Sequence, residues 1–216
     1  MGARCFFGFK PQHLLTAFIC FSLDFLDATD VSNQTQLNAV FNGTNPSPAN
    51  VITPFSLNAN ATQVTASLVE LTSNGSSIDC NDFSLADVSA NSTLRLDPSF
   101  TISGSVPGWN IQPNGIFQIT ADQNVASSNQ SSSSINIGDS GILVTEAGNI
   151  LNPINLVNGI GIIIKDTPGA TTFSGSIQEV GGTGGFQKIG PGTIRLSNAS
   201  NTYSGLSLPT NTKKKI

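Results

Sequence analysis

The residues most able to do chemistry in this 216-residue chain are its carboxylates, some clustered and others scattered. The stretch IDCNDFSLAD brings Asp79, Asp82 and Asp87 close together in sequence. Calcium needs six or more oxygen ligands, which usually come from a loop of fixed spacing. Because the spacing of these three residues matches no calcium loop, we interpret the cluster as a solvated loop and predict no metal site.

The scattered acids raise the question of sugar chemistry. Hydrolysis of a glycosidic bond uses two carboxylates at a defined separation. The sequence does not define the position of each acid within its coil well enough to place two of them in one groove. We therefore predict no catalytic residue and no enzyme, and keep a carbohydrate-active β-helix enzyme as an alternative. Two carboxylates on the same face of adjacent coils would support this enzyme hypothesis. The acids considered are Glu70, Asp97, Asp122, Asp139, Glu146, Asp166 and Glu179.

Nucleophilic and cofactor chemistry find little support. Cys80 is the one cysteine outside residues 1–28, and the single histidine, His13, lies within them. A thiol without an imidazole neighbour is best interpreted as a semi-buried cysteine. The glycine run Gly181–Gly185 (GGTGG) matches neither a dinucleotide fingerprint nor a P-loop, so we interpret it as a turn and predict no cofactor.

Two further features are open to a binding interpretation. Trp109 lies in SVPGWNIQPNG, where it could contact a partner or anchor a loop, and we favour a buried anchor. Asn-x-Ser/Thr sequons are glycan acceptors in some secreted proteins. We attribute those of this chain to chance in a composition rich in Asn, Ser and Thr; they begin at Asn33, Asn42, Asn60, Asn74, Asn91, Asn129 and Asn198.

The composition favours an all-β chain and argues against nucleic acid as a partner. Charged residues make up 10% of the chain, hydrophobic residues 38%, and the formal net charge is −4. Arg95 is the only basic residue between Pro11 and Ile164. Binding to phosphates requires a basic surface. We interpret the short run Lys213–Lys215 as a solvated tail.

The N-terminus is typical of a secretory signal. Arg4 and Lys10 precede the apolar stretch LLTAFICFSLDFL, and Ala28 is suited to the position before a cleavage point. We predict that residues 1–28 direct export and that the mature chain has no membrane span.

From about residue 93 a short motif recurs, a glycine followed by apolar or β-forming residues. It begins at Gly115, Gly141, Gly161 and Gly185, with spacings of 26, 20 and 24 residues. A second pair of similar segments, ISGSV at 102–106 and FSGSI at 173–177, lies 71 residues apart, about three such periods. Repeats of this length are typical of solenoids, in which each strand pairs with its copy in the next coil.

We therefore predict an all-β fold, a right-handed parallel β-helix over residues 93–216, preceded by an irregular or capping region over residues 29–92. A β-sandwich is the alternative fold. Gly190 and Gly192 should form a tight corner before a strand over 193–196. The side chains predicted to point inward are Ile116, Ile142, Val144, Ile162, Ile164, Ile194 and Leu196.

The segment from Phe173 to Gly205, FSGSIQEVGGTGGFQKIGPGTIRLSNASNTYSG, resembles the autotransporter-associated β-strand repeat of bacterial passenger domains. The matching residues are Phe173, Ser174, Gly175, Gly184, Gly185, Lys188, Gly190, Gly192, Thr193, Leu196, Ser197, Asn201, Thr202, Tyr203 and Gly205. The residues after Gly205 follow the family pattern poorly.

The resemblance implies an exported passenger that displays an adhesive, non-catalytic surface to host or cell-surface ligands. It also implies a C-terminal translocator barrel in the outer membrane, which this chain would need from elsewhere. We expect a cell-surface or extracellular location, or a periplasmic one if the translocator is absent. A truncated, non-functional gene product is a further alternative.

Overall fold

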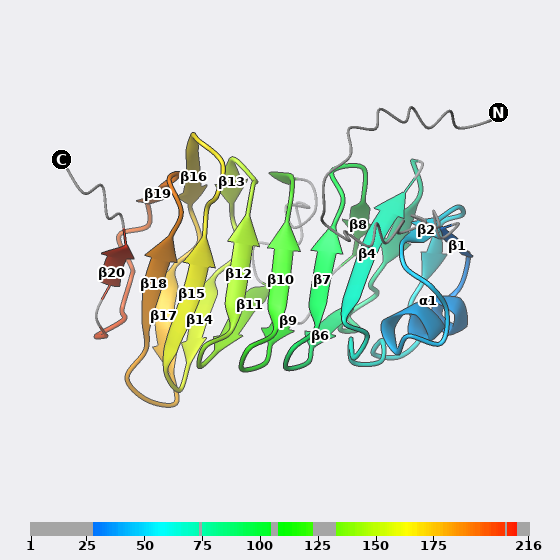
Figure 1. Ribbon diagram of the computed structural model, residues 1–216, viewed down its shortest axis with the longest axis horizontal. Helices are drawn as coiled ribbons and strands as arrows, with labels where there is room; N and C mark the ends of the chain where they lie inside the picture. The colour runs from blue at the N-terminus through cyan, green and yellow to red at the C-terminus, as the bar shows by residue number, and fades with distance from the viewer. Residues whose placement is uncertain (1–27, 74, 105–107, 123–132, 206, 211–216) are drawn as a thin grey trace, which may run out of the picture.

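The computed structural model describes residues 28–73, 75–104, 108–122, 133–205 and 207–210, and the predicted solenoid is confirmed (Figure 1). Every strand pairing in these ranges is parallel and joins one coil to the next. In Figure 1 the nearer strands run upward, the farther strands run downward, and the coils advance from right to left, so the winding is right-handed. The predicted signal and the Lys213–Lys215 tail lie outside the described residues.

One side of the solenoid is a nine-stranded sheet that extends from one end to the other. Its strands, in spatial order, are β1 (Thr29–Val31), β2 (Ala49–Val51), β4 (Leu68–Ser73), β7 (Thr93–Leu96), β10 (Ile116–Ile119), β12 (Ile142–Thr145), β15 (Ile160–Ile164), β18 (Gly185–Ile189) and β20 (Ser207–Thr210).

The other two sides complete each coil. The second side is a five-stranded sheet of β6 (Ala86–Val88), β9 (Gly108–Ile111), β11 (Ser134–Gly138), β14 (Ile154–Val157) and β17 (Ile177–Val180). The third consists of two three-stranded sheets. These are formed by β3 (Phe55–Ser56), β5 (Ser77–Asp79) and β8 (Thr101–Ser103), and by β13 (Asn149–Ile150), β16 (Ala170–Phe173) and β19 (Thr193–Leu196).

The core is a stack of aliphatic and aromatic side chains inside the coils. In the nine-stranded sheet, Leu94, Phe117, Leu143 and Ile163 lie opposite one another in register and are fully buried. Each such side chain removes its apolar surface from water, which stabilises the fold by about 1.5–3 kcal/mol relative to exposure. Because neighbouring coils share these contacts, the core is continuous along the axis.

The predicted inward positions are wrong by one residue in three strands. The inner face carries Phe117, Leu143 and Ile163, with their neighbours two residues on. The half-buried residues that point outward instead are Ile116, Ile142, Val144, Ile162 and Ile164. The sequences GIFQI, GILVT and GIIIK place apolar residues at both alternating positions, so the period of two does not fix the phase.

The phase of the last strand of the third side was predicted correctly. Ile194 and Leu196 lie opposite the buried Thr171 and Phe173, on the inner side of β19. Ile194 packs against the core, whereas Leu196 is 37% exposed because β19 is the edge strand of its sheet.

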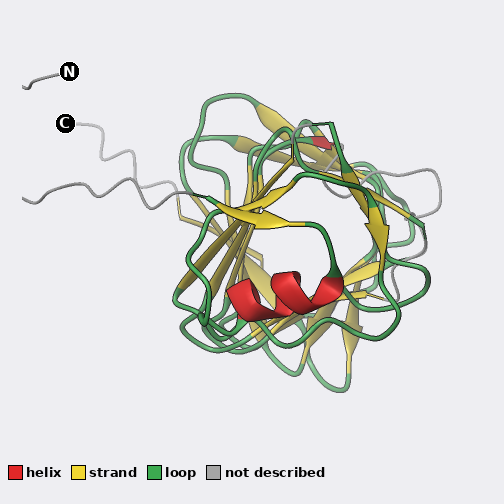
Figure 2. Ribbon diagram, turned by 90° about the vertical axis from the view of Figure 1, so that its right-hand side faces the viewer, coloured by secondary structure: helices red, strands yellow, loops and turns green. Residues whose placement is uncertain are grey.

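Residues 29–92, expected to be irregular or capping, contain both a cap and coils of the same solenoid. Helix α1 (Gln34–Phe41) begins at Asn33, whose side chain accepts a hydrogen bond from the Gln36 amide at 3.0 Å. It buries Leu37, Val40 and Phe41, and Figure 2 shows it lying across the opening of the solenoid. The strand ladder crosses the expected boundary, since β4 pairs with β7.

A recurring left-handed residue turns the chain from the second side to the nine-stranded sheet. Asn91, Asn114 and Ser140 each have φ of 61°, and Asn158 has φ of 58°. Asparagine tolerates this conformation better than most residues because its short polar side chain bonds locally. The Asn91 amide donates to the Asn114 carbonyl at 3.1 Å, and the Asn114 amide to Ser140 at 3.2 Å, so the turns stack.

The glycine corner predicted before β19 is confirmed. Gly190 has φ of +92°, and a Cβ there would lie 2.4 Å from the Lys165 carbonyl oxygen. At Gly192 an added Cβ would lie 2.1 Å from the Lys165 side chain. Only glycine therefore lets this corner approach the coil below.

Candidate functional site

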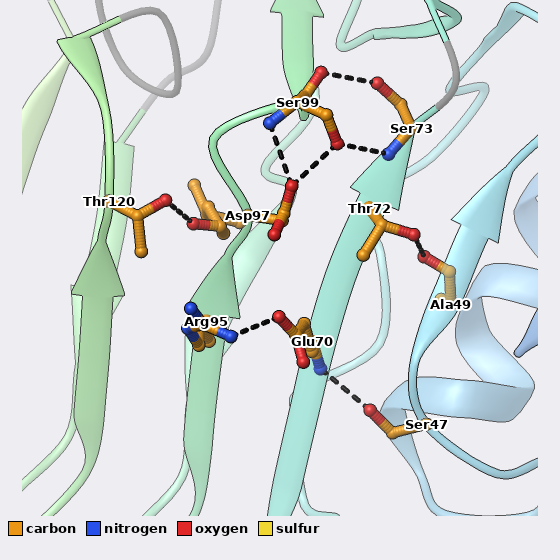
Figure 3. A network of polar contacts seen from close by, with 10 residues as sticks. Ser47, Ala49, Glu70, Thr72, Ser73, Arg95, Asp97, Ser99 and Thr120 are labelled. Carbon is orange, nitrogen blue, oxygen red and sulfur yellow. Dashed lines mark hydrogen bonds and ion pairs between the residues drawn. The ribbon is translucent and has the colours of Figure 1, made fainter. Parts of the chain in front are cut away.

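The scattered carboxylates bind elements of the solenoid itself. Glu70 forms an ion pair with Arg95 of the next coil (Figure 3). Asp122 accepts from the Gly148 amide at 2.6 Å and the Asn149 amide at 3.1 Å. These contacts join residues about one coil apart, so each carboxylate stabilises the stack.

One more acid joins neighbouring coils, and another fixes a turn. Asp139 accepts from the Ile160 amide at 3.0 Å, and Asp97 accepts from the Ser99 amide and hydroxyl at 2.9 and 2.7 Å. Ser99 continues this network, because its hydroxyl accepts from the Ser73 amide at 3.2 Å (Figure 3). The predicted acids thus serve turns and coil contacts, although Asp166 is exposed at the corner beside Gly190.

Lys165 is a buried cation on the inner side of the nine-stranded sheet. Its side chain is 4% exposed, and its Nζ donates to Glu146 Oε2 at 3.0 Å and to Thr167 Oγ1 at 2.7 Å. Removing a charge from water is costly unless partners replace the lost hydration. Removing one partner would therefore leave the other without its counter-charge and destabilise the corner.

The GGTGG turn, considered above as a phosphate cradle, is held by a carboxylate. Glu179 accepts from the Gly184 amide at 3.0 Å and from the amide and hydroxyl of Ser204 at 3.0 and 2.7 Å. These bonds, that of Gly184 first, lower the pKa of Glu179 from its ordinary value. An acid in this place disfavours phosphate.

Asp79, Asp87 and Cys80 have structural roles, whereas Asp82 is exposed. Asp79 accepts from the Asn81 amide at 3.1 Å and from the Ser56 hydroxyl at 3.2 Å, while Asp87 accepts from Gln112 at 3.0 Å. Within the described ranges, no three His, Cys, Asp or Glu side chains gather as metal ligands would. Cys80 is buried, and this burial, helped by the charge of Asp79, raises the pKa of its thiol to about 12.

Trp109 is a buried anchor, as favoured from the sequence, but it belongs to strand β9 and not to a loop. Its indole ring is fully buried and stacks on Phe117 with ring centroids 5.0 Å apart. This aromatic pair joins the second side of the solenoid to the nine-stranded sheet across the core.

An amide ladder follows the outer face of the second side. Gln178 Nε2 donates to Asn155 Oδ1 at 2.8 Å, Asn155 Nδ2 to Asn136 Oδ1 at 2.7 Å, and Asn136 Nδ2 to Asn110 Oδ1 at 2.8 Å. Beside it lies a groove of about 320 Å³, lined partly by Gln112 and Val157. The ladder gives this face fixed, uncharged side chains.

A second concavity, the cap pocket, lies between helix α1 and the chain that follows β3. Its volume is about 390 Å³, and its lining includes Asn33, Gln34, Asn38, Phe55, Asn58 and Asn60. No charged side chain lines it. A concave site with convergent polar groups and an apolar wall is suited to a small ligand.

Hydrogen bonds to the backbone fix the amides of the cap pocket. The Thr62 amide donates to Asn38 Oδ1 at 3.0 Å, and the Ser84 amide to Asn60 Oδ1 at 2.8 Å. Gln34 links α1 to the same stretch, since its Nε2 donates to the Ala59 carbonyl at 2.8 Å. The pocket is therefore formed by the fold before any ligand arrives.

Neither amide site was predicted from the sequence. The cap pocket falls in the region expected to be irregular, and its residues come together only when α1 crosses the end of the coil. The ladder has a recognisable sequence pattern, since WNI, INI and INL each place one Asn between two inward apolar residues in successive coils. Of the sequons, Asn33 caps α1 and Asn60 lines the pocket, while Asn74 and Asn129 lie outside the described residues.

Comparison with known proteins adds no relative. No protein-family model, no curated protein and no solved structure matches the chain. Helices of the described residues include none long and apolar enough to cross a bilayer.

Proposed function

We propose that this chain is an exported passenger-type β-solenoid, surface-exposed or secreted, that acts as a non-catalytic, adhesin-like scaffold. The observation that supports this best is the use of its carboxylates. Glu70, Asp122, Asp139 and Glu146 hold neighbouring coils together, Asp97 holds a turn, and Glu179 does both. An acid that is committed to backbone or cationic partners is poorly placed for catalysis.

The outer surfaces are suited to many weak contacts. The amide ladder and the cap pocket present neutral donors and acceptors on a rigid support. Binding to preformed groups costs little conformational entropy, so modest contacts repeated along the solenoid add up. The partners that we propose are host or cell-surface ligands. Export to the cell surface would use a translocator barrel supplied by another segment or protein.

Surface display tests this function. The full chain would be fused before the translocator barrel of a bacterial autotransporter, with the barrel alone as the control. We expect antibody labelling of intact cells, adhesion above the control, and a mature N-terminus immediately after Ala28. Labelling that requires permeabilised cells, or an uncleaved N-terminus, would contradict export.

A further inference from the structure

The cap pocket is not explained by the stability of the fold. The helix cap and the loop are already joined by Gln34, whose Oε1 also accepts from the Asn58 amide at 2.9 Å. The side chain of Asn58 is exposed at the rim, where it contributes to the lining. A preformed, uncharged hollow rich in amides therefore remains open beside these bonds.

We propose that the cap pocket binds a neutral sugar that carries an N-acetyl group, such as a terminal N-acetylhexosamine. This inference deepens the proposed function, on which it rests, because it names the ligand class of an adhesive surface. The site consists of Asn38, Phe55, Asn58 and Asn60, with Thr35 at its edge.

The orientation of the amides determines the kind of group recognised. A backbone N–H must face a side-chain oxygen, so the bonds from Thr62 and Ser84 assign Oδ1 of Asn38 and Asn60 to the protein. Both side chains line the pocket, and within the described residues their Nδ2 groups donate no hydrogen bond, so they are available to a ligand as donors. Fixed N–H donors recognise acceptors, and the acetamido carbonyl and ring hydroxyls of such a sugar provide them.

The remaining lining selects for a neutral ligand with an apolar side. Phe55 is half-buried and gives the pocket an aromatic wall, against which an acetyl methyl or the C–H face of a pyranose packs. No lysine or arginine lines the pocket to neutralise an anion. The first turn of α1 is already capped by Asn33, so its amides do not attract a phosphate strongly.

Titration of the purified full chain with small oligosaccharides tests the site. The probes are triacetylchitotriose, cellotriose, which lacks the acetamido groups, and the anionic trigalacturonate, each followed by calorimetry and by amide chemical shifts. We expect triacetylchitotriose to bind about tenfold more tightly than cellotriose, with shifts at Asn38 and Asn60, and trigalacturonate not to bind.

Isosteric variants separate recognition from folding. Asn38→Asp and Asn60→Asp keep the oxygen that accepts the backbone bond but replace the outward donor with a carboxylate oxygen. Each should weaken triacetylchitotriose binding about threefold to tenfold, since one hydrogen bond is removed. Asn42→Asp is the matched control, because Asn42 Oδ1 also accepts a backbone bond, from Thr44 at 2.9 Å, but lies outside the pocket.

Three results would overturn the proposal: no binding of triacetylchitotriose by the folded protein, shifts that map away from α1, or equal weakening by Asn42→Asp. Because the titration uses protein in solution, it is independent of surface display. Failure of display with intact sugar binding would refute export alone, and display without sugar binding would refute this site alone.

Discussion

Single side chains in this solenoid differ widely in what they contribute, and the two ion pairs show it. Lys165 is 4% exposed and its partner Glu146 is 22% exposed, whereas Arg95 and Glu70 are 36% and 25% exposed. One ion pair thus lies inside a corner of the solenoid, and the other lies on an outer face. Burial decides how much each pair contributes to the free energy of unfolding.

Lys165→Ala should lower the free energy of unfolding by about 3 kcal/mol, because it leaves a cavity and deprives Glu146 of its cation. Arg95→Ala, on the outer face, should cost less than about 1 kcal/mol. Urea unfolding followed by circular dichroism compares the two variants. Equal losses would mean that the corner around Lys165 is hydrated and its pair is no more than a surface contact.

Glu179 makes a pH-dependent contribution to stability. Its pKa is lowered in the folded protein by hydrogen bonds from Gly184 and Ser204, so the folded state favours the carboxylate. This stabilisation is fully present above the unfolded-state pKa and is lost as the pH falls through the lowered folded-state pKa. Urea midpoints should therefore fall more steeply on acidification in the wild type than in Glu179→Gln. Parallel curves for the two proteins would contradict this role.

Among the elements, the turns that enter the nine-stranded sheet repeat one backbone shape with different residues. Asn91, Asn114 and Asn158 suit the left-handed conformation, whereas Ser140, with φ of 61°, suits it less. Position 140 is therefore strained relative to the equivalent turns of the neighbouring coils.

Ser140→Gly should raise the free energy of unfolding by about 0.5–1 kcal/mol, because glycine adopts positive φ without steric cost. Ser140→Val should lower it by about 1–2 kcal/mol, since a β-branched side chain opposes that conformation. Thermal melts of both variants measure the change. A stabilising valine, or a destabilising glycine, would show that the hydroxyl and not the backbone matters here.

The sequence predicted strands better than the faces of strands. The motif beginning at Gly115, Gly141 and Gly161 is in register, but Gly161 pairs with Phe186 and not with Gly185. The first three glycines stay in register over coils of 26 and 20 residues, whereas Gly185 lies one residue out of register at β18. The amides of the cap pocket could not be grouped from sequence, because their proximity depends on the path of α1.

At the scale of the whole molecule, the two ends of the solenoid differ. Helix α1 lies across part of the opening at the β1 end (Figure 2), whereas β20 pairs with β18 and with no other strand that the structure describes. The stability of a stacked array is approximately a sum over neighbouring coils. Coils with neighbours on both sides should therefore open last.

Hydrogen exchange should reveal this gradient. Amides of β10, β12 and β15 should exchange most slowly, those of β2 next, and those of β20 fastest, since local opening is easiest where contacts are fewest. Exchange followed by mass spectrometry of peptides measures the order. Uniform protection from β2 to β20 would indicate a single cooperative unit and contradict the additive description.

The amide ladder has one further consequence. Gln178, Asn155 and Asn136 each donate toward the coil that precedes them, and none of the three bonds runs the other way. Their side-chain dipoles therefore add along the axis and do not cancel. The ladder therefore has a dipole of fixed direction, with amide hydrogen at the Asn110 end and carbonyl oxygen at the Gln178 end, and the carboxylate Asp87 lies in register with Asn110 at the positive end.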